Sequence, residues 1–245
     1  MGTLGYYQSI ESFALVDGPG VRSVLFLQGC PFRCLFCHNP DTWPFLKTNP
    51  ISPEEAFAKL SRFKPYWKNN GGITVSGGEP LSQLDFLVDF AKICRKNGVS
   101  LAIDTAGGPF HRDEKWLQKF DALLENSSLF LLDMKVFDPK IHKELVGADN
   151  ANVLDLFHYL AEKKFPIWVR RVLVPGRNDD PKILAQEGEF LSSLVNVKRI
   201  EVLPYHTHGT FKYKKLGIPY RLEGVNPPSE EQVKEAEKLL RVSSY

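Results

Sequence analysis

The sequence predicts an α/β fold: a partial (β/α)6 TIM-like barrel of parallel strands, with its active site at the carboxyl-terminal rim. Short β-branched and aromatic segments alternate with amphipathic helical segments along the 245 residues. This alternation is typical of βα units with right-handed crossovers. Polar residues recur where strands end, which favours a barrel, because barrel enzymes carry their chemistry at that rim. A flat doubly wound sheet would concentrate them at one switch point.

The predicted elements follow from the spacing of apolar residues. The strands are residues 21–27, 73–76, 99–104, 129–134, 167–174 and 199–203. The helices are residues 53–63, 84–97, 113–124, 152–164, 181–194 and 229–241. Ser52 and Glu55 predict the start of the first helix, and Asn97–Gly98 predicts the end of the second. We expect a single domain over residues 1–245.

Composition and charge exclude several classes of protein. The net charge is +2, from 31 basic and 29 acidic residues, which gives no electrostatic footprint for nucleic acid or an anionic membrane. No apolar segment reaches the 18 residues of a membrane span, and the amino-terminal residues lack the features of a signal peptide. We therefore expect a cytoplasmic protein, in which thiols stay reduced and the cluster of cysteines binds metal rather than forms disulfides.

Three of these cysteines, Cys30, Cys34 and Cys37, have the spacing C-x3-C-x2-C after the first predicted strand. His38 could complete a zinc site, although adjacent Cys37 and His38 cannot easily face one ion. The segment CLFCH also matches a c-type haem attachment, which leaves Cys30 unexplained. Buried structural thiols are a third interpretation.

An iron–sulfur cluster is the fourth interpretation, and four-iron clusters usually take four cysteines. Cys94 recurs with Leu84, Leu87 and Ala91 at helical spacing, so it is predicted to fill the core. Three ligands leave one iron open, and an open position is the mark of a catalytic metal site. The missing fourth thiolate is then the place where a substrate binds.

The segment CPFRCLFC, with Phe36 before the last cysteine, and the segment SGGEP at residues 76–80 resemble the radical S-adenosylmethionine (SAM) superfamily. In that superfamily the amino and carboxylate groups of SAM chelate the open iron. Residues 12–30, 37–43, 132–135, 170–180 and 203–213 are similar to the family of pyruvate formate-lyase activating enzymes. The resemblance covers about residues 9–228. It implies that a reduced [4Fe–4S] cluster cleaves SAM to methionine and a 5′-deoxyadenosyl radical, which makes a glycyl radical on the partner.

The resemblance also implies roles for particular residues. Cys30, Cys34 and Cys37 would hold the cluster. The SAM site would include Phe36, Cys37, His38, Gly77, Gly78, Glu79, Asp133, Met134, Lys135 and His206. Within it, Gly78 and Glu79 would receive the amino group, Lys135 would face the carboxylate, and His206 would flank the adenosine.

Two further residues, Arg170 and Asp17, have competing interpretations. Arg170 would bind or brace the carboxylate of SAM, or form an ordinary ion pair at the rim. Asp17 would meet the backbone of the incoming glycyl loop, or act as a turn carboxylate in the sequence DGPG.

A monovalent cation site is predicted from two carboxylates that end neighbouring strands, Asp104 and Asp133. Strands lie about 4.8 Å apart, so these charges repel unless a cation or proton compensates them. The Thr105 hydroxyl and the Leu131 carbonyl would complete an oxygen site for Na⁺ or K⁺. The alternative is that one aspartate turns outward to a helix amino terminus.

The expected partners are pyruvate formate-lyase as protein substrate and reduced flavodoxin or ferredoxin as electron donor, with a monomeric enzyme. A sister activator of another glycyl radical enzyme is the main alternative, although residues 38–78 contain no cysteine-rich insertion. An RNA-modifying radical enzyme would need a basic surface, and a zinc-binding module without catalysis would be colourless. Ala106 and His208 depart from the family pattern, and His111, His142 and His158 are predicted to lie at the surface.

Overall fold

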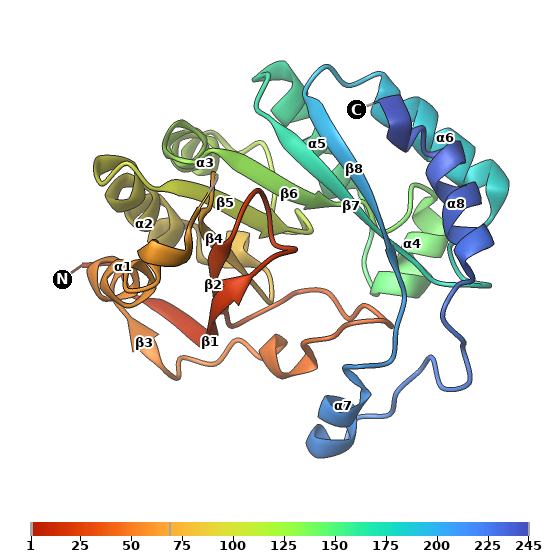
Figure 1. Cartoon of the computed structure of the whole chain (residues 1–245), viewed down its shortest axis with the longest axis horizontal. Helices are drawn as coiled ribbons and strands as arrows, with labels where there is room; N and C mark the ends of the chain where they lie inside the picture. Colours follow the sequence, from red (N-terminus) through yellow and green to blue (C-terminus); the bar gives the residue numbers. More distant parts are fainter. Residues whose placement is uncertain (1, 69, 245) are drawn as a thin grey trace. The chain divides into compact units, whose positions relative to one another are not determined.

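The computed structural model describes residues 2–68 and 70–244, and the chain forms two compact units (Figure 1). The first unit is Met1–Pro31 with Thr42–Leu131, and the second is Phe32–Asp41 with Leu132–Tyr245. Cys30 therefore belongs to the first unit, whereas Cys34 and Cys37 belong to the second. That one domain covers the whole chain stays a prediction.

The first unit is built on parallel strands with an antiparallel addition. Its strands are β1 (Gly5–Ala14), β2 (Arg22–Leu27), β3 (Pro50–Ile51), β4 (Gly72–Gly77) and β5 (Ser100–Thr105). β2, β4 and β5 pair in parallel, and β1 pairs antiparallel with both β2 and β3. The sequence did not predict β1, because its residues alternate between half-buried and exposed and lack a continuous apolar run.

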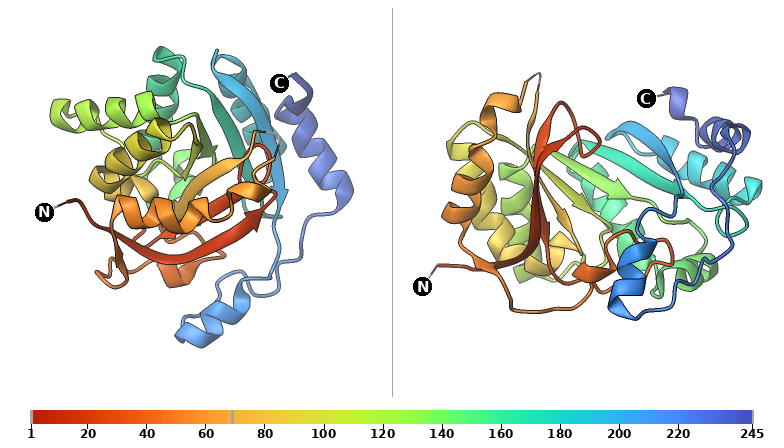
Figure 2. Two further views of the ribbon diagram at one scale, coloured as in Figure 1. Left: turned by 60° about the vertical axis from the view of Figure 1, so that its left-hand side comes forward. Right: turned by 60° about the horizontal axis from the view of Figure 1, so that its bottom comes forward.

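Three helices of this unit lie side by side in Figures 1 and 2. They are α1 (Pro53–Ser61), α2 (Leu84–Lys96) and α3 (Glu114–Asn126). Ser52 and Glu55 form a reciprocal capping box at the start of α1, as predicted. Gly98 follows α2 with a φ of 64°, a left-handed conformation that favours glycine, which confirms the predicted helix end.

The described residues of the second unit form a parallel strand pair and five α-helices. They are β7 (Ile167–Leu173), β8 (Val197–Pro204), α4 (Pro139–Val146), α5 (Ala151–Glu162), α6 (Pro181–Ser192), α7 (Thr210–Leu216) and α8 (Glu230–Leu239). α6 and α8 lie side by side (Figure 1) and share a core of Leu173, Leu184, Ala236 and Leu240. The sequence did not predict α4 and α7, which span only eight and seven residues.

The remaining strand, β6 (Leu129–Asp133), contains the boundary between the units. The strand order is β3-β1-β2-β4-β5-β6-β7-β8, so the strands of the six predicted βα units follow one another in chain order. This open, mostly parallel sheet confirms the predicted fold class. No helix within the described residues is long and apolar enough to cross a bilayer.

Candidate functional site

The cysteine loop of the second unit is anchored on α4. Leu35 N donates to Leu145 O at 2.9 Å, and Arg33 N donates to Val146 O at 2.8 Å. Within the loop, Cys37 N donates to Cys34 O at 3.2 Å. The helix that the sequence did not predict is therefore the support on which two of the three predicted cluster ligands rest.

The thiols of this loop have the chemistry that an iron–sulfur cluster requires. Cys30, Cys34 and Cys37 are reduced rather than disulfide-bonded, and Asn39 N donates to Cys37 Sγ at 3.4 Å. Burial raises the pKa of the Cys34 thiol to about 12, while the positive charge of Lys135 opposes that shift. Metal binding must therefore displace a proton from Cys34. Soft thiolates with N–H donors are the usual ligands of such clusters, so the donor set fits.

Among the described residues, no group of three or more His, Cys, Asp or Glu side chains is positioned to hold a metal ion. The three-cysteine ligation therefore stays a prediction.

Three predicted SAM-site residues of the second unit, Lys135, Asp133 and Phe36, lie close together. Lys135 Nζ lies 2.6 Å from Asp133 Oδ2 and 5.3 Å from the centroid of the Phe36 ring. Both charged side chains are mostly buried, with exposed fractions of 12% and 18%. The negative charge of Asp133 is thus already compensated by Lys135, whose ammonium group is held against the cysteine loop.

Two predicted adenosine neighbours, His38 and His206, stack on each other. The rings of His38 and His206 stack with centroids 4.0 Å apart, and His208 lies 4.3 Å beyond. His38 Nε2 is 3.2 Å from His206 O. Burial lowers the pKa values of His38 and His206, which favours neutral rings. Neutral aromatic rings suit a purine, and the unexpected His208 packs against His206 at a tilt of 40°.

Arg170 lies in the ion-pair position that competed with its predicted SAM role. Its Nε is 3.9 Å from Glu201 Oε2, and Arg199 Nε is 2.9 Å from the other oxygen of Glu201. The Arg170 carbonyl accepts a hydrogen bond from the buried Met134 N at 2.9 Å. Arg170 thus contacts the segment that carries Lys135 through its backbone.

In the first unit, the Glu79 carboxylate accepts hydrogen bonds on both oxygens. Leu81 N and Thr105 Oγ1 donate to Oε1 at 3.0 and 2.5 Å, and Ala106 N donates to Oε2 at 2.9 Å. These donors fix the side chain that was predicted to meet the amino group of SAM. Ala106, one of the departures from the family pattern, takes part through its backbone.

The glycines before Glu79 are required by close backbone approach. Gly77 has a φ of 124°, and a Cβ there would collide with the backbone of Leu27. A Cβ on Gly78 would collide with the carbonyl of Gly29, and Glu79 N donates to that carbonyl at 2.8 Å. The SGGEP segment thus turns sharply against the end of β2.

The predicted cation ligands of the first unit already have polar partners. Asp104 Oδ2 accepts from Ser76 Oγ at 2.6 Å. The Thr105 hydroxyl donates to Glu79 and accepts from Gly107 N at 2.9 Å. Asp104 and Asp133 lie at or next to the carboxyl ends of β5 and β6, as predicted, but the cation itself stays a prediction.

Comparison with known proteins identifies the family. Residues 24–186 match the Radical SAM superfamily. The pyruvate formate-lyase-activating enzyme of Listeria monocytogenes is 47% identical over 243 residues, which cover 99% of this chain and 98% of that protein. The chain belongs to the pyruvate formate-lyase-activating enzyme family of the radical SAM superfamily. This activating enzyme therefore uses SAM and a [4Fe–4S] cluster, as members of that superfamily do.

Solved structures agree. A domain of a pyruvate-formate lyase-activating enzyme from Bacteroides vulgatus is 30% identical, with a TM-score of 0.57 over 70% of this chain and 93% of that one. A radical SAM methyltransferase from Sphaerobacter thermophilus is similar over 98% of this chain and 75% of its own, with a TM-score of 0.64. Since its identity is 14%, it supports the fold alone.

Sequence reasoning missed the residue that fixes Asp17. Arg22 is fully buried and donates to Thr74 Oγ1 at 2.7 Å, and Thr74 Oγ1 donates to Asp17 O at 2.6 Å. Burial lowers the pKa of Arg22 to about 10, and the Asp17 carboxylate opposes that shift. An arginine at the start of a mostly apolar strand, two residues after Gly20 of the Gly-Pro-Gly turn, was the available signal.

One histidine prediction was wrong. His142 is buried on α4, with its Nδ1 2.8 Å from Ala148 O and its ring edge-on to Phe32. It was misassigned because α4 was not predicted, so its inward face could not be recognised. His111 and His158 are exposed, and Cys94 is fully buried on α2, as predicted.

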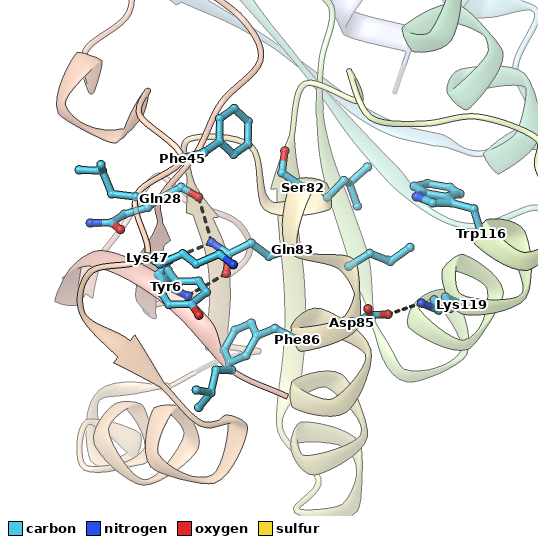
Figure 3. Close-up of a pocket in the computed structure, with 14 residues that line it drawn as sticks. Tyr6, Gln28, Phe45, Lys47, Ser82, Gln83, Asp85, Phe86, Trp116 and Lys119 are labelled. Carbon is cyan, nitrogen blue, oxygen red and sulfur yellow. Dashed lines mark hydrogen bonds and ion pairs between the residues drawn. The ribbon is translucent and has the colours of Figure 1, made fainter. Parts of the chain in front are cut away.

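The cavity shown in Figure 3 lies apart from the residues that are predicted to bind the cluster or SAM. It measures about 430 Å³ within the first unit, and Phe45, Phe86 and Trp116 are among its lining residues. Gln83 spans its floor by hydrogen bonds to Tyr6 and to Gln28 O. None of the residues predicted to hold the cluster or SAM lines it.

Proposed function

We propose that this enzyme activates pyruvate formate-lyase anaerobically by generating a glycyl radical on it. The observation that carries the proposal is the 47% identity to the Listeria monocytogenes protein over nearly the whole length of both chains. When bound, the cluster would supply one electron to SAM, which would split into methionine and a 5′-deoxyadenosyl radical, and that radical would take a Cα hydrogen from one glycine of the partner.

The cluster would be held by Cys30, Cys34 and Cys37, which leave one iron for SAM. The bond from Asn39 N to Cys37 Sγ supports this role, because N–H donors stabilise charge on a ligand sulfur. The full burial of Cys94 on α2 argues against it as a fourth ligand.

The remaining SAM contacts divide by charge. Lys135 would attract the carboxylate, supported by its burial beside the loop. Glu79 would attract the ammonium group of SAM. Gly77 and Gly78, which have no side chains, would let the backbone approach SAM closely. His38 and His206 would stack on the adenine, and Met134 would supply apolar contact. Arg170 would brace Met134 and Lys135 from β7.

Asp17 would hold the glycyl loop of the partner. We expect Asp17→Asn to weaken activation of pyruvate formate-lyase about tenfold, since a charge-assisted hydrogen bond to backbone amides is lost. Cleavage of SAM without the partner should change less than twofold. Activation is measured by the yield of glycyl radical, and cleavage of SAM by the formation of 5′-deoxyadenosine. Equal losses of the two rates would show that Asp17 is only a turn residue.

A monovalent cation would be held by Asp104, Thr105, Leu131 and Asp133. We expect activity and SAM affinity to rise with Na⁺ or K⁺ relative to a bulky organic cation at equal ionic strength. Asp104→Ala should flatten that response. Titration of SAM binding with each salt measures this, and a wild-type enzyme indifferent to the cation would refute the site.

We further propose one domain over residues 1–245, a cytoplasmic monomer, and reduced flavodoxin or ferredoxin as electron donor.

The first alternative function is activation of a different glycyl radical enzyme. Anaerobic incubation with SAM and reductant against a panel of glycyl radical enzymes tests this choice. Activation of pyruvate formate-lyase alone supports the proposal, whereas activation of another enzyme alone refutes it. A colourless protein with one zinc would refute both.

A further inference from the structure

The backbone of residues 135–137 is irregular although it is largely buried. These residues follow β6 and precede α4, so they have neither strand nor helix partners. Buried backbone groups must find hydrogen-bond partners elsewhere. In this segment buried side chains supply them.

Three polar side chains converge on these residues. Asn178 Nδ2 donates to Lys135 O at 3.2 Å, and Phe137 N donates to Glu187 Oε1 at 2.6 Å. Asn150 Nδ2 donates to Phe137 O at 2.8 Å. Exposed fractions of 0%, 0% and 3% for Asn178, Glu187 and Asn150 show that solvent does not substitute for these bonds.

Arg171 joins two members of this group. Its Nε donates to Glu187 Oε2 at 2.8 Å, and its terminal nitrogen donates to Asn178 O at 2.6 Å. Asn178 Oδ1 accepts from Val174 N at 2.7 Å, and its Nδ2 also reaches Val172 O at 2.9 Å. Asn178 is therefore fixed between β7 and the segment that carries Lys135.

A buried network of charged and polar side chains such as this one is not expected to add much to the free energy of unfolding. Desolvation of a buried ion pair can exceed its Coulombic gain, and an apolar replacement is often neutral or stabilising. A fully satisfied buried network does specify one geometry. The geometry fixed here is that of Lys135, whose ammonium group faces Asp133 and the Phe36 ring.

We propose that Asn178, together with Arg171 and Glu187, is a positioning network that sets Lys135 for the carboxylate of SAM. The inference rests on the proposed function of Lys135 and adds the residues that act through it. Asn178 does not touch SAM. Its amide group donates a hydrogen bond to the Lys135 carbonyl. This bond fixes the position of the backbone from which the Lys135 side chain extends.

The test compares two buried asparagines of the same unit. Asn178→Ala removes the bond to Lys135 O, whereas Asn196→Ala removes a bond from Nδ2 to Phe165 O, 2.7 Å long. Calorimetric titration of the cluster-loaded enzyme with SAM should show a Kd raised about tenfold in the first variant, as for other supporting hydrogen bonds. The matched control should stay within twofold. Hydrogen exchange at the Phe137 amide should accelerate only in the first.

Asn178→Ser, which is too short to reach Lys135 but keeps a polar group, replaces the alanine variant if that one does not fold. The same Kd in the Asn178 and Asn196 variants would overturn the network. Adding Asn178→Ala to Lys135→Ala should raise the Kd no further, and an additive increase would also overturn it. If Lys135→Ala alone leaves the Kd unchanged, the proposed role of Lys135 fails first, whatever the network does.

Discussion

Replacement of Cys30, Cys34 or Cys37 by Ala is expected to abolish iron retention and SAM cleavage. In the proposed site each thiolate would hold a different iron of a four-iron cluster, and no other cysteine lies near in sequence. Iron content after anaerobic reconstitution and 5′-deoxyadenosine formation after addition of reductant measure the two effects. Both should fall to the level of protein-free controls.

Cys94→Ala is the matched control. Its thiol is fully buried on α2, and burial raises the pKa of that thiol to about 12. The variant should keep its iron and lose only packing, on the order of 1 kcal/mol. A Cys94→Ala protein that loses its brown colour would contradict a three-cysteine cluster.

Arg22→Met is expected to destabilise the first unit by about 3–5 kcal/mol, the usual cost of breaking a buried charged network. The change keeps much of the aliphatic length but removes the donors to Thr74 Oγ1 and to the carbonyls of Ile73 and Ser100, at 2.7, 2.5 and 3.0 Å. Urea denaturation of the anaerobic protein measures the loss. Activation of the partner should fall as well, because the Thr74 hydroxyl, which donates to the Asp17 carbonyl, loses the donor that orients it.

Arg95→Met provides the comparison for Arg22→Met. Arg95 is exposed and donates to Glu125 O, so its loss should cost less than about 0.5 kcal/mol. Equal midpoints for the two variants would show that the Arg22 hydrogen bonds contribute nothing beyond those of a surface arginine.

The parallel core of the fold could be predicted because its strands are short apolar runs between amphipathic helices. β1 could not, since alternating half-burial leaves a polar-looking sequence without turn signals. α4 and α7 are too short for their periodicity to stand out, although Asp138, Pro139 and Gly147 supply start and stop signals for α4. His142 was misplaced as a direct consequence.

In the candidate site, the features set by neighbouring residues could be predicted from the sequence, whereas contacts between distant residues could not. The spacing of the cysteines and the SGGEP turn are local patterns, and their geometry follows from them. The roles of Arg22 and Asn178 depend on partners 52 and 43 residues away, Thr74 and Lys135. No pattern within a single strand or helix can reveal such contacts.

The central claim is that this enzyme takes a hydrogen atom from a glycine of pyruvate formate-lyase. The direct measurement uses pyruvate formate-lyase carrying glycine deuterated at Cα, incubated anaerobically with the enzyme, SAM and reductant. We expect an electron paramagnetic resonance signal of a glycyl radical, together with one deuterium in the 5′-deoxyadenosine found by mass spectrometry. Formation of 5′-deoxyadenosine with no deuterium and no glycyl radical would contradict this claim.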